Sequence, residues 1–190
     1  MRMTSARLYK TLAASLVIGI GAAGYGIAQE KTVMVGGAAM YPSKTIVDNA
    51  VNSRDHTTLV AAVQAAGLVD TLKSAGPFTV FAPTNDAFGK LPAGTVSTLV
   101  KPENKATLTK ILTYHVVAGK MSAMDLAHHA EMHGGKATLK TVAGETLTVS
   151  KRGGGWIVTD AKGGVAAITI ADVNQSNGVI HVVDTVLMPG

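Results

Sequence analysis

Apolar residues are concentrated near the C-terminal end of the chain, over residues 179–188. The pair that precedes them, Asn177-Gly178, is typical of a tight turn, because both residue types tolerate positive φ. The two-residue period of a strand places apolar side chains on both faces, with His181 on one face and Asp184 on the other. Strands that are apolar on both faces are covered on both, so the pattern predicts a central strand here.

The first half of the chain shows the three-to-four-residue spacing of short amphipathic helices. One strand interrupts them at residues 78–83, where Pro83 ends the strand and Thr84 is a natural N-cap for the next helix. Residues 114–119 are expected to be extended, and residues 32–35 to form an edge strand. Helices are expected over residues 45–51, 55–66, 68–72 and 95–100, and again after Thr84, Pro102 and Ser122.

Beyond Gly134-Gly135 the pattern changes to short strands separated by glycine-containing turns. The predicted strands cover residues 139–142, 146–150, 156–159 and 165–170. Evenly spaced short strands of this kind favour an antiparallel meander. Helices in the first half and strands in the second predict an α+β domain rather than an alternating α/β fold.

Residues 1–28 have the pattern of a secretory signal peptide. Arg2, Arg7 and Lys10 give a positive start, an apolar stretch follows, and small residues precede a cleavage site after Ala28. A membrane anchor is the alternative, but the apolar stretch is shorter than the ~20 residues of a span and contains several glycines. The rest divides into a lead-in at residues 29–42 and a single domain at residues 43–190.

Composition narrows the functional classes. The chain has 17 Lys and Arg against 12 Asp and Glu, a net charge of +5, and three of those cations lie in the predicted signal peptide. The remaining chain is only weakly basic, so no nucleic-acid partner is expected. The absence of cysteine excludes disulfides, thiol catalysis and thiolate zinc sites. No later segment is long enough to span a membrane, so we expect an exported protein, periplasmic or secreted.

Two long segments and one dipeptide resemble a known family. Residues 78–88, Phe-Thr-Val-Phe-Ala-Pro-Thr-Asn-Asp-Ala-Phe, resemble the first signature box of the fasciclin domain. Residues 177–187, Asn-Gly-Val-Ile-His-Val-Val-Asp-Thr-Val-Leu, resemble its second box, and Tyr114-His115 is similar to its Tyr-His motif. Their order and separation fit one complete copy, as in small bacterial secreted proteins that consist of a single fasciclin domain.

The resemblance implies a fasciclin-like fold, a β-sandwich or wedge with helices packed around it, in which the two boxes are neighbouring core strands. It also implies adhesion, with a cell-surface or matrix protein or a polysaccharide as partner, and neither an enzymatic reaction nor a cofactor. The structural residues that it assigns to the two boxes are Phe78, Val80, Phe81, Thr84, Asn85, Phe88, Ile180, His181, Val183 and Leu187.

The same resemblance suggests where partners bind. The Tyr-His region and an Asp-Ile dipeptide before the second box are proposed interaction sites in animal members of the family. Here these correspond to Tyr114, His115 and the pair Asp172-Val173, whose valine departs from the animal pattern. The alternative for His115 is a structural role, since a buried imidazole normally finds hydrogen-bond partners inside the domain.

A second functional hypothesis comes from residues 128–133, His-His-Ala-Glu-Met-His. On a helix His129 and His133 lie one turn apart, so the segment could serve a periplasmic small-ligand or metal-binding protein. A zincin motif would need Glu in place of Ala130. Trp156 could stack on a sugar or belong to the core. No nucleophile elbow or phosphate-binding loop occurs in the sequence, which argues against a hydrolase.

Overall fold

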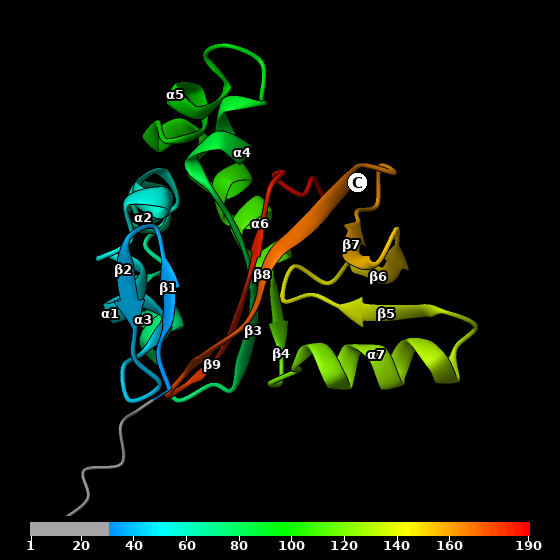
Figure 1. Ribbon diagram of the computed structural model, residues 1–190. Coiled ribbons are helices and arrows are strands. Elements are labelled where there is room, and N and C mark those ends of the chain that lie inside the picture. The colour runs from blue at the N-terminus through cyan, green and yellow to red at the C-terminus, as the bar shows by residue number, and fades with distance from the viewer. Residues whose placement is uncertain (1–30) are drawn as a thin grey trace, which may run out of the picture.

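The structure, a computed structural model, describes residues 31–190 (Figure 1). The predicted signal peptide and the first two residues of the lead-in lie outside the described residues. Seven strands form one sheet in the order β4-β3-β9-β8-β7-β6-β5, and β1 pairs with β2 in a separate hairpin. The strands are β1 (Val33–Val35), β2 (Ala38–Met40), β3 (Phe78–Pro83), β4 (Val116–Ala118), β5 (Lys136–Lys140), β6 (Thr146–Arg152), β7 (Gly155–Thr159), β8 (Val165–Gln175) and β9 (Gly178–Val183).

The central position predicted for the last strand is confirmed, because β9 lies between β3 and β8. It runs parallel to β3 and antiparallel to β8. The strands from β5 to β9 pair with their sequence neighbours in antiparallel fashion, as the meander prediction required. The mixture of this sheet with helices confirms the α+β class.

Most helices precede the meander. They are α1 (Ile46–Ala50), α2 (Thr57–Ala66), α3 (Val69–Lys73), α4 (Asn85–Gly89), α5 (Thr95–Leu99), α6 (Lys105–Tyr114) and α7 (Ala123–Met132), with 3₁₀ turns at Arg54–His56 and Pro102–Asn104. Local chemistry explains several of their starts. The Thr45 and Thr84 side chains cap α1 and α4, and Ser122 with Asp125 forms a complete capping box on α7.

Two buried clusters lie on opposite sides of the central strands. In what we call the helical cluster, Val80 of β3 and Ile180 of β9 pack with α1, α2, α3 and α6. In what we call the strand cluster, Phe81 and Val183 pack with α7 and the meander. Figure 1 shows this division, with α1–α3 on one side of β3 and β9 and with α7 and β5–β7 on the other. Because successive side chains of a strand point to opposite faces, β3 and β9 each contribute residues to both clusters.

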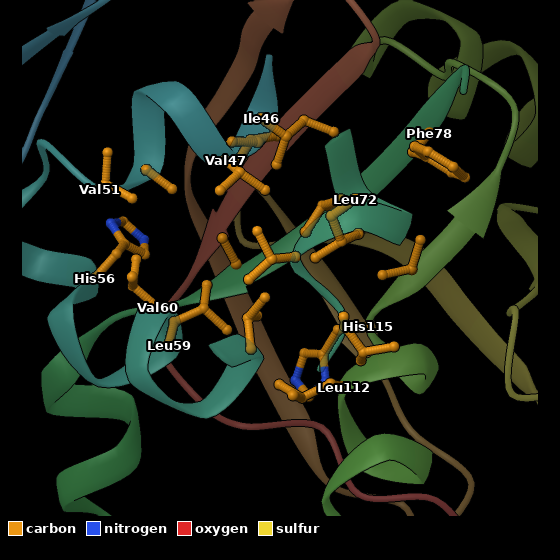
Figure 2. Close-up of a pocket in the computed structure, with 18 of the residues that line it drawn as sticks. Ile46, Val47, Val51, His56, Leu59, Val60, Leu72, Phe78, Leu112 and His115 are labelled. Carbon is orange, nitrogen blue, oxygen red and sulfur yellow. The ribbon is translucent and has the colours of Figure 1, made fainter. Parts of the chain in front are cut away.

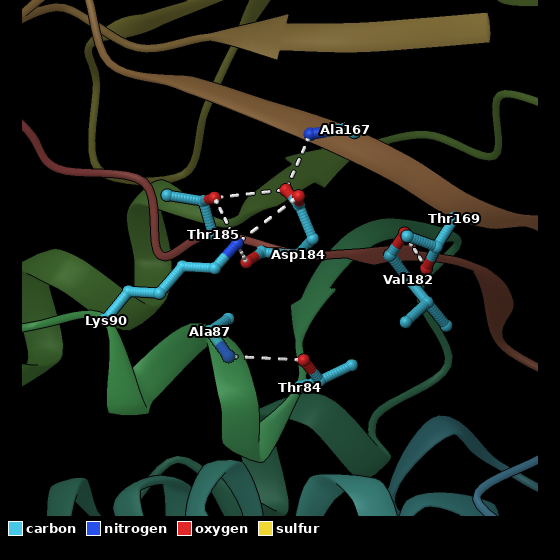
Figure 3. Close-up of polar contacts among 8 residues, drawn as sticks. All are labelled: Thr84, Ala87, Lys90, Ala167, Thr169, Val182, Asp184 and Thr185. Atoms are coloured by element: carbon cyan, nitrogen blue, oxygen red, sulfur yellow. Dashed lines mark hydrogen bonds and ion pairs between the residues drawn. The ribbon is translucent and has the colours of Figure 1, made fainter.

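The two signature segments are also joined beyond their ladder (Figure 3). The Thr84 N–H donates to the Val183 carbonyl at 3.2 Å, directly after the last paired residues. Lys90 Nζ donates to the Asp184 carbonyl at 2.6 Å and lies 3.3 Å from its carboxylate. The Asp184 carboxylate accepts the Ala167 N–H at 2.8 Å. Both ends of α4 are thereby tied to the end of β9 and the residue that follows it.

Two expectations about local structure are wrong. Tyr114 is helical rather than extended, because the buried face of α6 at Leu108 and Ile111 continues to it at helical spacing. The last strand ends at Val183, where the Asp184 contacts take over. The edge strand expected at residues 32–35 is present as β1, one half of the hairpin β1–β2. Val35 and Met40 of this hairpin belong to the helical cluster, so the lead-in contributes to the core.

Candidate functional site

Tyr114 is completely buried in the strand cluster. Its hydroxyl donates to the Thr146 carbonyl at 2.9 Å and accepts the Ala161 N–H at 2.8 Å. Burial raises the pKa of this phenol, an effect that the Ala161 N–H partly opposes. The side chain therefore holds the end of α6 against β6 and the loop after β7, and a partner protein has no access to it in this fold.

His115 is 2% exposed and serves as a similar connection. Its Nδ1 lies 2.8 Å from the Ile111 carbonyl, and its Nε2 accepts the Leu187 N–H at 3.0 Å. Both contacts are satisfied by the neutral tautomer that carries its proton on Nδ1. Burial lowers the pKa of His115 to about 4, so the ring is uncharged at neutral pH. The imidazole joins α6 to the segment that follows β9.

Asp172 is the one residue of the predicted interaction set that reaches the surface. It has a φ of 58°, the only positive φ outside glycine among the described residues. Its carboxylate accepts the Ala123 N–H at the start of α7 at 2.7 Å, and its own N–H donates to Nδ1 of His181 at 3.3 Å. The other ring nitrogen of His181 donates to the Met121 carbonyl at 2.9 Å. This chain of contacts fixes β8, β9 and the β4–α7 loop relative to one another.

The β8 strand is irregular where it carries Asp172. Its register with β9 shifts between Ile168 and Ile170 and again between Ile170 and Val173. Bulges of this kind bend a strand and redirect its side chains. Val173 returns to the helical cluster and is 1% exposed, whereas Asp172 and the following Asn174 remain accessible.

Sequence reasoning missed the exposed residues beside this bulge. Lys120 and Met124 flank the loop and helix start that Asp172 binds, and the Met124 side chain is 79% exposed. We call Lys120, Met124, Asp172 and Asn174 the Asp172 surface. The signal available in the sequence was a methionine at the second position of the helix whose start Ser122 predicts. A single exposed apolar side chain is ordinary on a protein surface, so Met124 is singled out because it lies next to the residue that Asp172 anchors.

The predicted interaction residues thus separate into two groups. Tyr114, His115 and Val173 are buried and make internal contacts, so their side chains do not form a surface for a partner. The structure does not bring Tyr114 or His115 into hydrogen-bond contact with Asp172. The box residues lie mainly in the interior, with Phe81, His181 and Val183 fully covered and Phe78, Thr84 and Asn85 partly covered.

The histidine segment lies in the last turn of α7. The rings of His129 and His133 face each other with centroids 4.5 Å apart, as their spacing predicts. However, His133 Nδ1 contacts the His129 carbonyl at 2.8 Å, so one of the two ring nitrogens of His133 is already hydrogen-bonded. Within residues 31–190 no three His, Asp or Glu side chains come together to hold a metal ion. Metal binding here stays a prediction, resting on two histidines.

Trp156 of β7 is only partly buried and packs at the margin of the strand cluster. Lys151 Nζ lies 5.3 Å from the centre of its ring, in the geometry of a cation–π contact. A sugar would compete with this lysine for the ring face. In the described part of the chain, no helix combines the length and the apolar character that crossing a membrane requires.

Comparison with known proteins identifies the family of this chain. The fasciclin domain model matches residues 54–189. The chain is 49% identical over 160 residues to Protein sll1483 of Synechocystis sp., covering 84% of this chain and 82% of that protein. It is 40% identical over 145 residues to immunogenic protein MPB70 of Mycobacterium bovis, covering 74% of this chain and 66% of that protein.

A solved structure shows the same fold at lower identity. The domain pair of the insect cell adhesion molecule fasciclin I superposes with a TM-score of 0.69 at 19% identity. The match covers 78% of this chain and 52% of that chain, so this protein spans about half of the pair. Together with the family match over both signature segments, these similarities show that the chain belongs to the fasciclin domain family.

Proposed function

We propose that this protein is an exported, non-enzymatic adhesion module that binds a cell-surface or matrix protein or a polysaccharide through the Asp172 surface. Family membership supports the general role, and the solved relative is a cell adhesion molecule by its description. The observation that carries the choice of surface is the left-handed backbone at Asp172. Non-glycine residues in this region are uncommon and cluster at functional positions.

The contacts of Asp172 explain how such a surface is kept rigid. The carboxylate fixes the first N–H of α7, and the amide is fixed by the buried His181. Lys120, Met124 and Asn174 are therefore presented from anchored backbone rather than from a free loop. Rigid presentation of a polar rim around one exposed apolar side chain lowers the ordering cost of binding.

Adhesion is tested by a binding screen of the labelled protein, recovered after export of the full chain, against intact cells and a glycan array. We expect saturable binding, with Met124→Lys weakening it about tenfold or more, as for a central interface residue. Met132→Lys is the matched control, because Met132 is 68% exposed at the opposite end of the same helix. Equal binding by the two variants would remove this surface, and no saturable binding would remove the adhesion role.

Export is tested on the same preparation. Intact mass and N-terminal sequencing of protein from the periplasm and the medium should place the first residue at Gln29. Protein that retains residues 1–28 and fractionates with membranes would instead support the anchor alternative.

A further inference from the structure

A cavity of about 270 Å³ lies inside the helical cluster, between α1–α3 and the face of β3, β4 and β9 (Figure 2). Figure 2 shows Ile46, Val47 and Leu72 on one side of this space, with Leu59 on the other. Val63, Val80 and Ile180 are among the other lining residues. Protein interiors contain few voids larger than a water molecule, so this volume is far beyond an ordinary packing defect.

The lining offers a ligand almost no hydrogen bonds. His115 borders the cavity, but its two ring nitrogens contact Ile111 and Leu187. Thr113 also borders it, and its hydroxyl donates to main-chain carbonyls of its own helix. A site of this composition would leave the polar groups of a sugar or nucleotide unpaired, which is unfavourable. The lining of the cavity is therefore suited to the apolar part of a ligand.

One buried polar atom in the lining is the exception. His56 is 3% exposed, and its Nδ1 contacts the Ser53 hydroxyl at 2.9 Å. Its Nε2 makes no hydrogen bond of normal geometry, although the Ala82 main chain lies near enough to oppose the effect of burial, which lowers the pKa of His56. Nearly all buried polar atoms find partners. The neutral ring can form a hydrogen bond with at most one oxygen atom of a bound molecule.

The rim of the cavity carries charge. Asp48 of α1 and Lys73 of α3 both line it and pair at 2.9 Å, and their side chains are 45% and 44% exposed. The bond from Lys73 and the hydroxyl of Thr45 lower the pKa of Asp48, and the more distant Lys44 acts in the same direction. An ammonium group has three N–H donors, so Lys73 keeps donors beyond the one that binds Asp48. Since its side chain is 44% exposed, these donors can bind an anionic group at the rim.

We propose that this cavity binds the acyl chain of an anionic amphiphile, with its acidic head group beside Lys73. The volume sets the length of the chain that fits. A cavity of about 150 Å³ holds benzene, with six carbon atoms, so 270 Å³ accommodates roughly ten. The ligand is thus a saturated carboxylate of about decanoate length or an equivalent part of a longer lipid. This site shares no residue with the Asp172 surface.

Calorimetry with decanoate and decanol, kept below their aggregation concentrations, tests the proposal on the exported protein. We expect saturable one-to-one binding, and affinity that rises about fourfold per added CH₂ up to about ten carbons and then levels off. Lys73→Met should weaken decanoate about fivefold while leaving decanol unchanged, because it removes the cation and keeps the aliphatic stem. Lys136→Met on β5 is the control and should change neither ligand.

A second variant locates the ligand. Val63→Phe places a ring in the cavity and should weaken decanoate and decanol together, and Val63→Leu serves the same purpose if the larger residue prevents folding. Contacts between decanoate and the methyl groups of Leu72 and Ile180 should be visible by NMR. The acyl chain could come from a free fatty acid or from a membrane lipid, and phosphatidylglycerol vesicles distinguish these two sources. A site for the free acid binds decanoate when no vesicles are present.

Three results would overturn the proposal. These are no heat with either ligand, affinity that keeps rising beyond about twelve carbons, and binding that folded Val63 variants leave unchanged. Binding to vesicles without binding of decanoate would indicate adsorption to a membrane surface and would also exclude the cavity.

Discussion

The buried neutral state of His115 makes the stability of the domain depend on pH in a calculable way. The pKa of this imidazole is about 4 in the folded protein, against 6.5 for an unperturbed histidine. Because the folded pKa is the lower one, the unfolded chain binds the proton more readily as the pH falls below 6.5. The stabilisation that His115 provides is complete above pH 6.5 and is lost between pH 6.5 and pH 4.

The size of the loss follows from the two values. One pKa unit corresponds to 1.36 kcal/mol, so His115 alone lowers the free energy of unfolding by about 2 kcal/mol at pH 5 and about 3 kcal/mol at pH 4. Burial also lowers the pKa values of His56 and His181, which contribute with the same sign. These terms are a large part of the stability of an ordinary domain, about 5–15 kcal/mol.

The His115→Gln variant isolates this contribution in urea titrations at pH 7, 6, 5 and 4. At pH 7 the variant should be about 1–3 kcal/mol less stable, because glutamine does not reach both partners of the ring. The difference should shrink toward pH 4, since only the natural protein has this proton to bind. His128→Gln, at an exposed position, is the control and should follow the natural pH profile. Parallel profiles for His115→Gln and the natural protein would refute a neutral buried imidazole.

Substitutions at four further positions test the fold. Phe81→Ala and Ile180→Ala should each lower the free energy of unfolding by roughly 2–5 kcal/mol in urea titrations, and near-native melting would contradict their burial. Asp172→Ala should cost about 1–2 kcal/mol, because it removes the acceptor for the Ala123 N–H, whereas Asp172→Asn should have little effect by thermal melting. Gly178→Ala should prevent folding, as judged by circular dichroism, because its Cβ would lie 2.1 Å from a β3 carbonyl oxygen; a folded variant would exclude the parallel pairing as described.

Periodicity was sufficient for most of the fold because the elements carry their own local signals. The alternation over residues 179–188 predicted a central strand, which the structure confirms although the strand ends at Val183. The side chains of Thr84 and Ser122 predicted helix starts that the structure also confirms. Only the resemblance predicted that the two boxes are neighbouring strands, and their parallel direction was not predicted. Nothing local indicates it, since the two strands are about a hundred residues apart in the chain and meet through tertiary packing.

The candidate sites were harder to predict because burial depends on the whole fold. Tyr114 and His115 are polar residues at the end of a helix, a position that is exposed or buried according to what packs there, and β6 and the C-terminal segment cover them. The cavity likewise arises from helices and strands that are distant in sequence. The resemblance named Asp172 as an interaction residue together with Tyr114 and His115, and nothing in the sequence distinguished it from the buried pair or anticipated its left-handed backbone.

The polar residues of the signature segments make hydrogen bonds to other segments of the same domain. Asn177 accepts the Ile46 N–H and donates to two carbonyls at the end of α3, just as His115 and His181 each join two distant segments. Since these side chains are buried and already hydrogen-bonded within the domain, we look for recognition in residues outside the signature. The Asp172 surface and the cavity rim are two such regions with separate residues, so Met124→Lys and Lys73→Met should change cell binding and decanoate binding independently. If either variant changed both, the two activities would share one site, and the division into adhesion surface and acyl cavity would be wrong.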